Sequence, residues 1–438
     1  MIVLLHNFKN IFLVSELRKK LLFTLGIFAV YRFGAHIPIP GVDIVALKSF
    51  FATSNSGLLS YLDLFSGGAL QNFAILTLGM SPYISASIMT QLLTVMIPSL
   101  EQLSKEGEYG RRIIGQYTRY LTLVISFVQG LGLAMFIEKQ PGLVLNPGWA
   151  FRLSAVFILT VGSLFVMWIG EQINAHGLGN GSSMVIFAGI VTRLPFALVT
   201  LAKDVSLGQT DIIRVILLGF FAVSIIACIV FLEKGERKVP VQYAKRVVGN
   251  KLYGGQSSYI PLKLNPSGVV PVIFASAILG LPVTLASMLA VYWPMLNNIV
   301  ARWFTSDAGL YNVLNAGLII FFAFFYTAII FNPTELAENL RKSGGFIPGI
   351  RPGKKTAEFF DYLLTRIGFP GAVYLALLAI LPNMLKNIIG FPIMFSGVSL
   401  LIVIGVALEA SAQIESHLIE RKYEGFLSTG RLKSRFGR

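Results

Sequence analysis

Residues 61–96 read YLDLFSGGALQNFAILTLGMSPYISASIMTQLLTVM and contain one charged residue, Asp63. The stretch is far longer than the roughly 20 residues that a membrane-spanning helix needs. Ser66-Gly67-Gly68 interrupts it where glycine favours a bend, and Pro82 removes one backbone amide further on. We therefore predict a half-helix over about 61–70, a glycine joint and a spanning helix over about 74–96. A half-helix at membrane depth needs protein or a water-filled cavity around it, which favours the centre of a channel or transporter. A re-entrant surface segment is the alternative.

The composition indicates an all-α polytopic membrane protein. The chain has 438 residues, of which 55% are hydrophobic and 13% are charged, and its mean hydropathy is +0.71. Soluble domains carry about 25% charged residues. The single cysteine, Cys228, excludes an intrachain disulfide. The four histidines lack metal-ligand spacing, and no P-loop is found, so we expect no metal and no cofactor.

Apolar runs predict ten spans in two five-span halves, residues 1–202 and 203–438. The spans lie at about 21–37, 74–96, 119–137, 152–173, 182–202, 212–232, 267–291, 311–331, 369–389 and 395–413. An odd number of spans per half gives the halves inverted orientations, as in many transport folds. Arg32, near the end of the first span, is expected to extend to the membrane interface.

The net charge of +15 reports topology. Six segments hold 27 of the 36 Lys and Arg residues: 1–20, 98–119, 171–181, 233–265, 332–368 and 414–438. The positive-inside rule makes these segments, and both termini, cytoplasmic. The loops 233–265 and 332–368 are long and punctuated by Gly and Pro, which is typical of docking surfaces.

The motifs FSGGAL, PYISASI and QLLTV (within 65–95), GEYGRR (107–112), GLGNGSS (177–183), YAKR (243–246) and GIRPG (349–353) resemble the SecY family. The resemblance covers nearly the whole chain in the family's order. It implies a protein-conducting channel with an hourglass pore, through which unfolded polypeptides cross and apolar segments leave sideways into lipid. The half-helix would be its plug, comprising Tyr61, Leu64, Phe65, Ser66, Gly67, Gly68, Ala69 and Leu70.

The family closes its pore with a ring of mostly isoleucine side chains, and apolar constrictions gate by dewetting. The matching positions are Met80, Ile84, Ile186, Ile190, Ile273 and Ile402. Met80 departs from the usual isoleucine, but methionine adapts to irregular neighbours. Without the resemblance, each is an ordinary apolar residue of a span.

The family's lateral gate lies between the second and seventh spans, with the third nearby. The second span is unusually polar, and the resemblance marks Ser85, Ser87, Gln91, Gln129 and Asn265 at this seam. We expect Ser85, Gln129 and Asn265 to form a polar cluster across it. Alternatively, each bonds its own helix backbone.

The resemblance also implies partners: the SecE and SecG subunits, the motor ATPase SecA, the translating ribosome, signal peptides and other precursor segments, and membrane lipid. The docking residues would be Arg237, Lys238, Lys245, Arg246 and Arg351. The expected location is the bacterial plasma (inner) membrane, in preference to a thylakoid membrane.

Two rival functions have weaker sequence support. A secondary transporter shares broken helices and inverted repeats, but it should show a polar midplane site, and only Arg193 and Glu409 are notable there. An intramembrane hydrolase should show a catalytic Ser/His or paired-Asp arrangement, which we do not find. We therefore expect a channel and not an enzyme.

Overall fold

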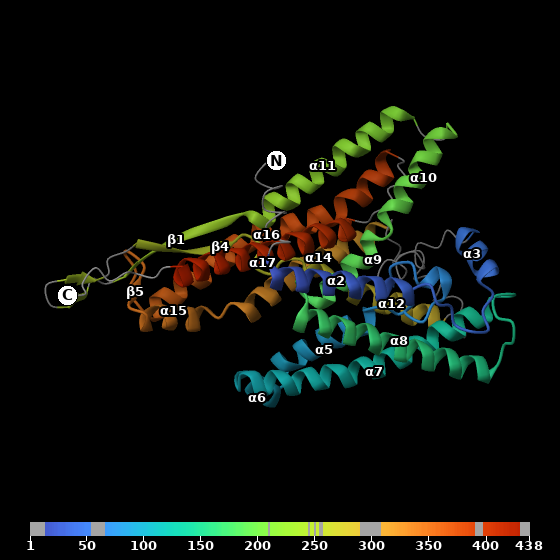
Figure 1. Cartoon of the computed structure of the whole chain (residues 1–438), viewed down its shortest axis with the longest axis horizontal. Helices are drawn as coiled ribbons and strands as arrows, with labels where there is room; N and C mark the ends of the chain where they lie inside the picture. The colour runs from blue at the N-terminus through green and yellow to red at the C-terminus, as the bar shows by residue number, and fades with distance from the viewer. Residues whose placement is uncertain are drawn as a thin grey trace. The chain divides into compact units, whose positions relative to one another are not determined.

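A computed structural model describes residues 14–53, 66–208, 211–243, 246–248, 251–253, 257–289, 308–389 and 397–429. These residues are mostly helical (Figure 1). The chain divides into two compact units: residues 1–55, 62–195 and 406–438 form the first, and residues 56–61 and 196–405 form the second. The boundary between the two units falls within the last helix, α17 (Gly397–Thr429), directly after Gly405. The proposed halves, 1–202 and 203–438, stay a prediction.

The first unit is a helical bundle. Helix α5 (Ser81–Met96) packs on α7 (Glu108–Lys139), α7 packs on α8 (Trp149–His176), and α8 packs on α9 (Gly181–Val191). Helix α2 (Ser15–Gly34) packs on α8 and α9. Ile39, Leu47, Phe73, Ile137 and Leu159 belong to one buried core cluster that joins the loops to the bundle. The helices are α2 (Ser15–Gly34), α3 (Ile44–Thr53), α5 (Ser81–Met96), α6 (Pro98–Lys105), α7 (Glu108–Lys139), α8 (Trp149–His176), α9 (Gly181–Val191) and the later part of α17 (Gly397–Thr429).

The predicted helix over 74–96 is corrected at its start, because α5 begins at Ser81. Before it, a 3-10 turn η1 (Leu70–Asn72) ends at Phe73, whose φ of 41° is left-handed. The Phe73 carbonyl accepts from the Ile39 amide at 3.0 Å, and the Ile75 amide donates to the Ile37 carbonyl at 2.9 Å. These bonds take backbone groups that a helix would use. Pro82 consequently lies in the first helical turn, where its missing amide costs no bond.

The second unit contains helices and a small sheet. It comprises most of α10 (Leu194–Ser206), α11 (Ile212–Lys234), α12 (Val270–Leu289), α14 (Gly309–Ile330), α15 (Pro333–Lys342), α16 (Lys354–Ile389), and the strands β1 (Glu236–Tyr243), β2 (Arg246–Val248), β3 (Lys251–Tyr253), β4 (Ser257–Lys263) and β5 (Gly345–Phe346). Helix α14 packs on α12 and α16. β1 pairs antiparallel with β4 in the register Val239↔Ile260 and with β5 in the register Gln242↔Phe346, while β2 and β3 form a short hairpin.

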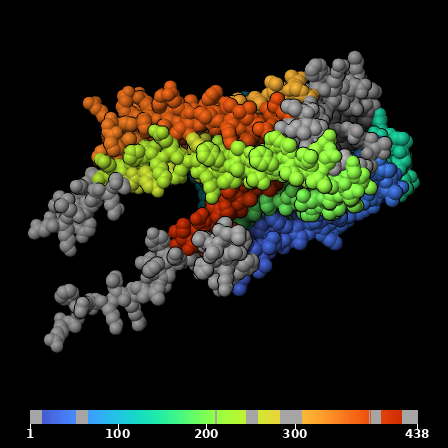
Figure 2. Space-filling view, turned by 90° about the horizontal axis from the view of Figure 1, so that it is seen from above, coloured from blue at the N-terminus to red at the C-terminus, as the bar shows by residue number. Residues whose placement is uncertain are grey.

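The two long loops, 233–265 and 332–368, share one apolar core. The antiparallel strands β1 and β4 form a ribbon. Its residues Val239, Val241 and Leu262 are buried together with Leu340 of α15 and Phe360 of α16. In Figure 2 the yellow-green ribbon segment lies along the orange α15–α16 segment. The sequence interpretation did not foresee these strands; the two loops form one folded surface.

Seven helices among the described residues are long and apolar enough to cross a membrane, and the α5–α6 pair, bent by 100°, would make eight. The bend occurs where α5 ends at the extended Ile97 and Pro98 opens α6. The predicted span over 182–202 corresponds to α9 and α10, which are separated by a short turn but together make one of these seven candidate spans. A multi-pass helical membrane fold is confirmed, whereas the count of ten spans stays a prediction.

Candidate functional site

The glycine joint of the broken stretch is seated directly on helix α9. A Cβ built on Gly67 would lie 2.7 Å from the Cα of Gly189, and the φ of Gly67 is +64°. Only glycine allows such a backbone approach in this conformation. Because Gly189 adjoins Ile190 and follows Ile186 by three residues, the joint lies beside two of the predicted ring positions.

Helix α2 supplies two side chains that hold this joint. Arg32 donates from Nη1 to the Gly67 carbonyl at 2.9 Å, and Tyr31 donates its hydroxyl to the Ser66 carbonyl at 3.3 Å. The Arg193 guanidinium lies near Gly68. The charged end of Arg32 thus has a backbone carbonyl as its partner, and the expectation that it extends to the membrane interface stays a prediction. No motif flagged Arg32 or Tyr31, because their partner is backbone 35 residues away.

The predicted plug is described only in part. Tyr61, Leu64 and Phe65 lie outside the described residues. Ser66, Gly67, Ala69 and Leu70 are buried, and Gly68 is half-buried. The Ser66 hydroxyl accepts a hydrogen bond from the Leu70 amide at 3.3 Å, which closes a compact turn after the joint. The role of this segment as a plug stays a prediction.

The six predicted ring residues are all buried. Met80 caps the start of α5 one turn before Ile84, and Ile186 and Ile190 lie one turn apart on α9, all in the first unit. The Met80 methyl group rests on Gly170 of α8, where a Cβ would approach it to 2.7 Å. Ile273 and Ile402 are buried in the second unit. Their convergence into one ring stays a prediction.

The predicted gate residues of the first unit include buried polar groups with few hydrogen-bond partners among the described residues. Ser85 is 2% exposed, and its hydroxyl has no hydrogen-bond partner in the described part of the chain. Gln91 donates to the Ser87 hydroxyl at 3.3 Å, but its side-chain oxygen has no such partner. Gln129 is half-buried on α7, which packs on α5. Buried polar atoms that lack partners are costly, so Ser85 and Gln91 stabilise their surroundings poorly within the described part of the chain.

Asn265 belongs to the second unit and is fully engaged there. Its amide nitrogen donates to Glu233 at 2.7 Å and to the Gly268 carbonyl at 2.9 Å, while its oxygen accepts from Ser267 at 3.0 Å. The expected cluster of Asn265 with Ser85 and Gln129 stays a prediction. The sequence interpretation missed the Glu233 contact, which lies across a 32-residue separation.

Of the predicted docking residues, Arg237, Lys238 and Arg351 lie on the folded surface made by the two loops. Arg237 and Lys238 are exposed on β1, and the Lys238 ammonium lies 4.8 Å from the centre of the Tyr259 ring. Arg351 is exposed in a turn between two glycines of positive φ, Gly349 and Gly353. Arg246 begins β2, and Lys245 lies outside the described residues.

Solved structures with this fold are protein-conducting channels. A structure described as that of a protein conducting channel superposes with a TM-score of 0.65 at 16% identity and covers 95% of both chains. Canine Sec61, solved in a ribosome-channel complex from the endoplasmic reticulum, gives a TM-score of 0.63 at 15% identity and 95% coverage of both chains. These superpositions, at such low sequence identity, show the fold class.

Sequence relatives give the family. The SecY family model matches residues 74–411. The protein translocase subunit SecY of Aquifex aeolicus is 44% identical over 96% of this chain and 98% of its own length. The Escherichia coli K12 subunit of the same name is 43% identical over 97% of both chains. The chain belongs to the SecY family and is a subunit of a protein-conducting channel.

Proposed function

We propose that the buried apolar residues Met80, Ile84, Ile186, Ile190, Ile273 and Ile402 close the resting pore, and that residues 61–70 plug it. The observation that carries this proposal is the Gly67–Gly189 contact, which seats the joint of the broken stretch beside two of these residues. An apolar constriction excludes ions when it is dry and binds no passing chain tightly. The chain would thus provide the path for a polypeptide, while a partner supplies the energy.

Sideways release of apolar segments is proposed to begin at the polar side chains of α5. Ser85 and Gln91 are supported in this role by their unpartnered buried oxygens. Polar contacts between spans are worth only about 0.6 kcal/mol on average. A seam closed by such contacts opens at low cost when a signal peptide offers a better apolar partner.

The basic folded surface is proposed to dock the energy source. Arg237, Lys238 and Arg351 are exposed on one small domain, and arginine recognises carboxylates and phosphates bidentately. The motor ATPase SecA and the translating ribosome are the proposed partners, alongside SecE and SecG. A Sec61 relative and a yeast Ssh1 relative were each solved with a ribosome.

We place the chain in the inner membrane of a bacterium with both termini cytoplasmic. The distribution of Lys and Arg supports this orientation, and the relatives cited above are bacterial. In this arrangement the ribbon β1–β4 and the turn around Arg351 project on the cytoplasmic side.

Reconstitution tests the proposal. Vesicles holding the chain with SecE, SecG and SecA should import a secretory precursor in an ATP-dependent manner. A variant lacking residues 61–70 should keep its membrane topology but conduct ions at rest. Import in the absence of ATP and precursor-independent solute uptake would indicate a transporter instead, and an electrically silent deletion variant would remove the plug assignment.

A further inference from the structure

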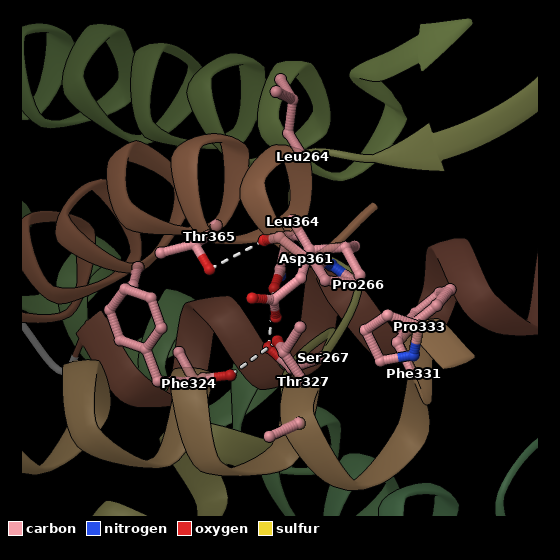
Figure 3. Close-up of a pocket in the computed structure, with 15 residues that line it drawn as sticks. Leu264, Pro266, Ser267, Phe324, Thr327, Phe331, Pro333, Asp361, Leu364 and Thr365 are labelled. Carbon is pink, nitrogen blue, oxygen red and sulfur yellow. Dashed lines mark hydrogen bonds between the residues drawn. The ribbon is translucent and has the colours of Figure 1, made fainter. Parts of the chain in front are cut away.

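A cavity of about 170 Å³ lies within the second unit, between α14, α16 and the linker that follows β4 (Figure 3). Its walls are mostly apolar and include Phe324, Phe331 and Leu364. Thr327 and Thr365 also line it, and each hydroxyl donates to a carbonyl of its own helix, at 2.7 and 2.9 Å. Their oxygens remain able to accept a hydrogen bond from a ligand.

One carboxylate gives this cavity its charge. Figure 3 shows Asp361 pointing from α16 into the space beside Thr327 and Ser267. Among the described residues that line the cavity, Asp361 is the only charged one; it is exposed and takes part in none of the ion pairs found in the described part of the chain. Glu233 is held nearby through Asn265. The cavity therefore has acceptors and negative charge, and it favours a cation that donates hydrogen bonds.

The cavity lies where the apolar surface of the helices gives way to a polar one. Two apolar side chains of α16, Phe369 and Leu377, are 57% and 59% exposed, as expected for contact with lipid tails. Toward its N-terminus, α16 carries Lys354, Lys355 and Arg366. Helix α14 likewise changes from apolar residues to the polar α15 just after Phe331. Such a transition marks the level of lipid headgroups.

We propose that this cavity binds the primary ammonium group of an aminophospholipid headgroup, with Asp361 as the counter-ion and Thr327 and Thr365 as neutral acceptors. An ethanolamine headgroup carries an ammonium with three N–H donors, and its acyl chains would extend along the exposed apolar side of α16. A trimethylated choline headgroup keeps the charge but has no N–H donor. An anionic glycerol headgroup would meet the Asp361 carboxylate with like charge.

The test measures lipids that remain bound to the full chain in its complex with SecE and SecG. The complex is reconstituted with phosphatidylethanolamine, phosphatidylcholine or phosphatidylglycerol of matched chains, and bound lipid is counted by native mass spectrometry. Wild type should retain the ethanolamine lipid over the choline lipid by about fivefold, the order expected for one solvated charge-assisted bond. Asp361→Asn should abolish this preference, since it keeps the shape and removes the charge.

Glu358→Gln is the matched control. Glu358 lies on the same helix, is exposed and pairs with Lys355 at 2.8 Å outside the cavity. This variant should keep the ethanolamine preference, and both variants should unfold at the wild-type temperature. Equal retention of the ethanolamine and choline lipids by wild type, or a preference that survives Asp361→Asn, would overturn the proposal. Asp361-dependent stabilisation by free ethanolamine without any lipid preference would overturn the lipid assignment.

Discussion

Gly67 and Gly189 touch backbone to backbone: a Cβ at position 189 would lie 3.2 Å from the Gly67 Cα, and a Cβ at position 67 would come closer still. Neither partner can carry a side chain without moving the joint of the broken stretch. This contact fixes where the joint lies relative to Ile186 and Ile190 on α9.

Gly189→Ala should displace the joint and cost about 1–3 kcal/mol, as overpacking of a tight contact does. We expect the resting channel to conduct ions, measured as single-channel current in a planar bilayer. Gly219→Ala on α11 is the control, because a Cβ there has no atom within 4 Å. A silent Gly189→Ala channel with an unchanged unfolding temperature would show that the contact seals nothing.

Arg32→Gln should loosen the same joint by removing the bond to the Gly67 carbonyl. Bonds from charged donors are worth about 1.5–3 kcal/mol, so a thiol placed at the buried Ser66 should be labelled roughly 10- to 150-fold faster. Ser66→Cys is made in a Cys228→Ala background, which removes the one native thiol. Arg32→Lys keeps a cationic donor and should give an intermediate rate. Identical rates in all three proteins would contradict the assignment.

Arg351→Glu should abolish translocation driven by the motor ATPase while leaving the amount of folded protein unchanged. The guanidinium is exposed and held in a turn, so charge reversal disrupts docking and not packing. Arg341→Glu, a nearby exposed arginine whose Nη2 lies 3.7 Å from Glu338, serves as the control. If Arg351→Glu translocates precursor at the wild-type rate, Arg351 is a topology charge only.

Phe360→Ala should unfold the docking surface selectively. Phe360 is 0% exposed in the core that joins the two loops, and such truncations cost about 3–5 kcal/mol. We expect proteolysis within 233–265 to accelerate while the spanning helices stay protected. Phe359→Ala, at a half-buried neighbouring position, should have a smaller effect. Equal protease resistance of Phe360→Ala and wild type would show that the loops fold independently.

Cysteine pairs between α5 and α12 should crosslink and block export if these helices form the lateral gate. The scan combines Ser87→Cys with single cysteines at 270–280 in a Cys228→Ala background, and a reducing agent should restore export. Efficient crosslinking with undiminished export would place the sideways exit elsewhere.

The sequence predicted the class of fold well because apolar runs and basic segments follow directly from the physics of a bilayer. It placed α5 seven residues too early, since apolar content alone cannot reveal that 37–39 competes for the backbone of 73–75. The contact of Arg32 with Gly67 was not predicted, because its partner is a backbone carbonyl, which leaves no trace in side-chain patterns. The strands around Val239 and Val241 were missed because their burial depends on Phe360, more than 100 residues away along the chain.

The shared core of the two loops also constrains how this surface can change over evolution. Val241 and Phe360 are packed into one cluster, so a substitution in either loop alters the support of the other. A chimaera that takes only residues 233–265 from a distant relative would pack that relative's strands against α15 and α16 of this chain. Exchange of both loops would keep the strands with the helices that they pack on. Because the two loops are supported by one core, we expect their sequences to diverge together.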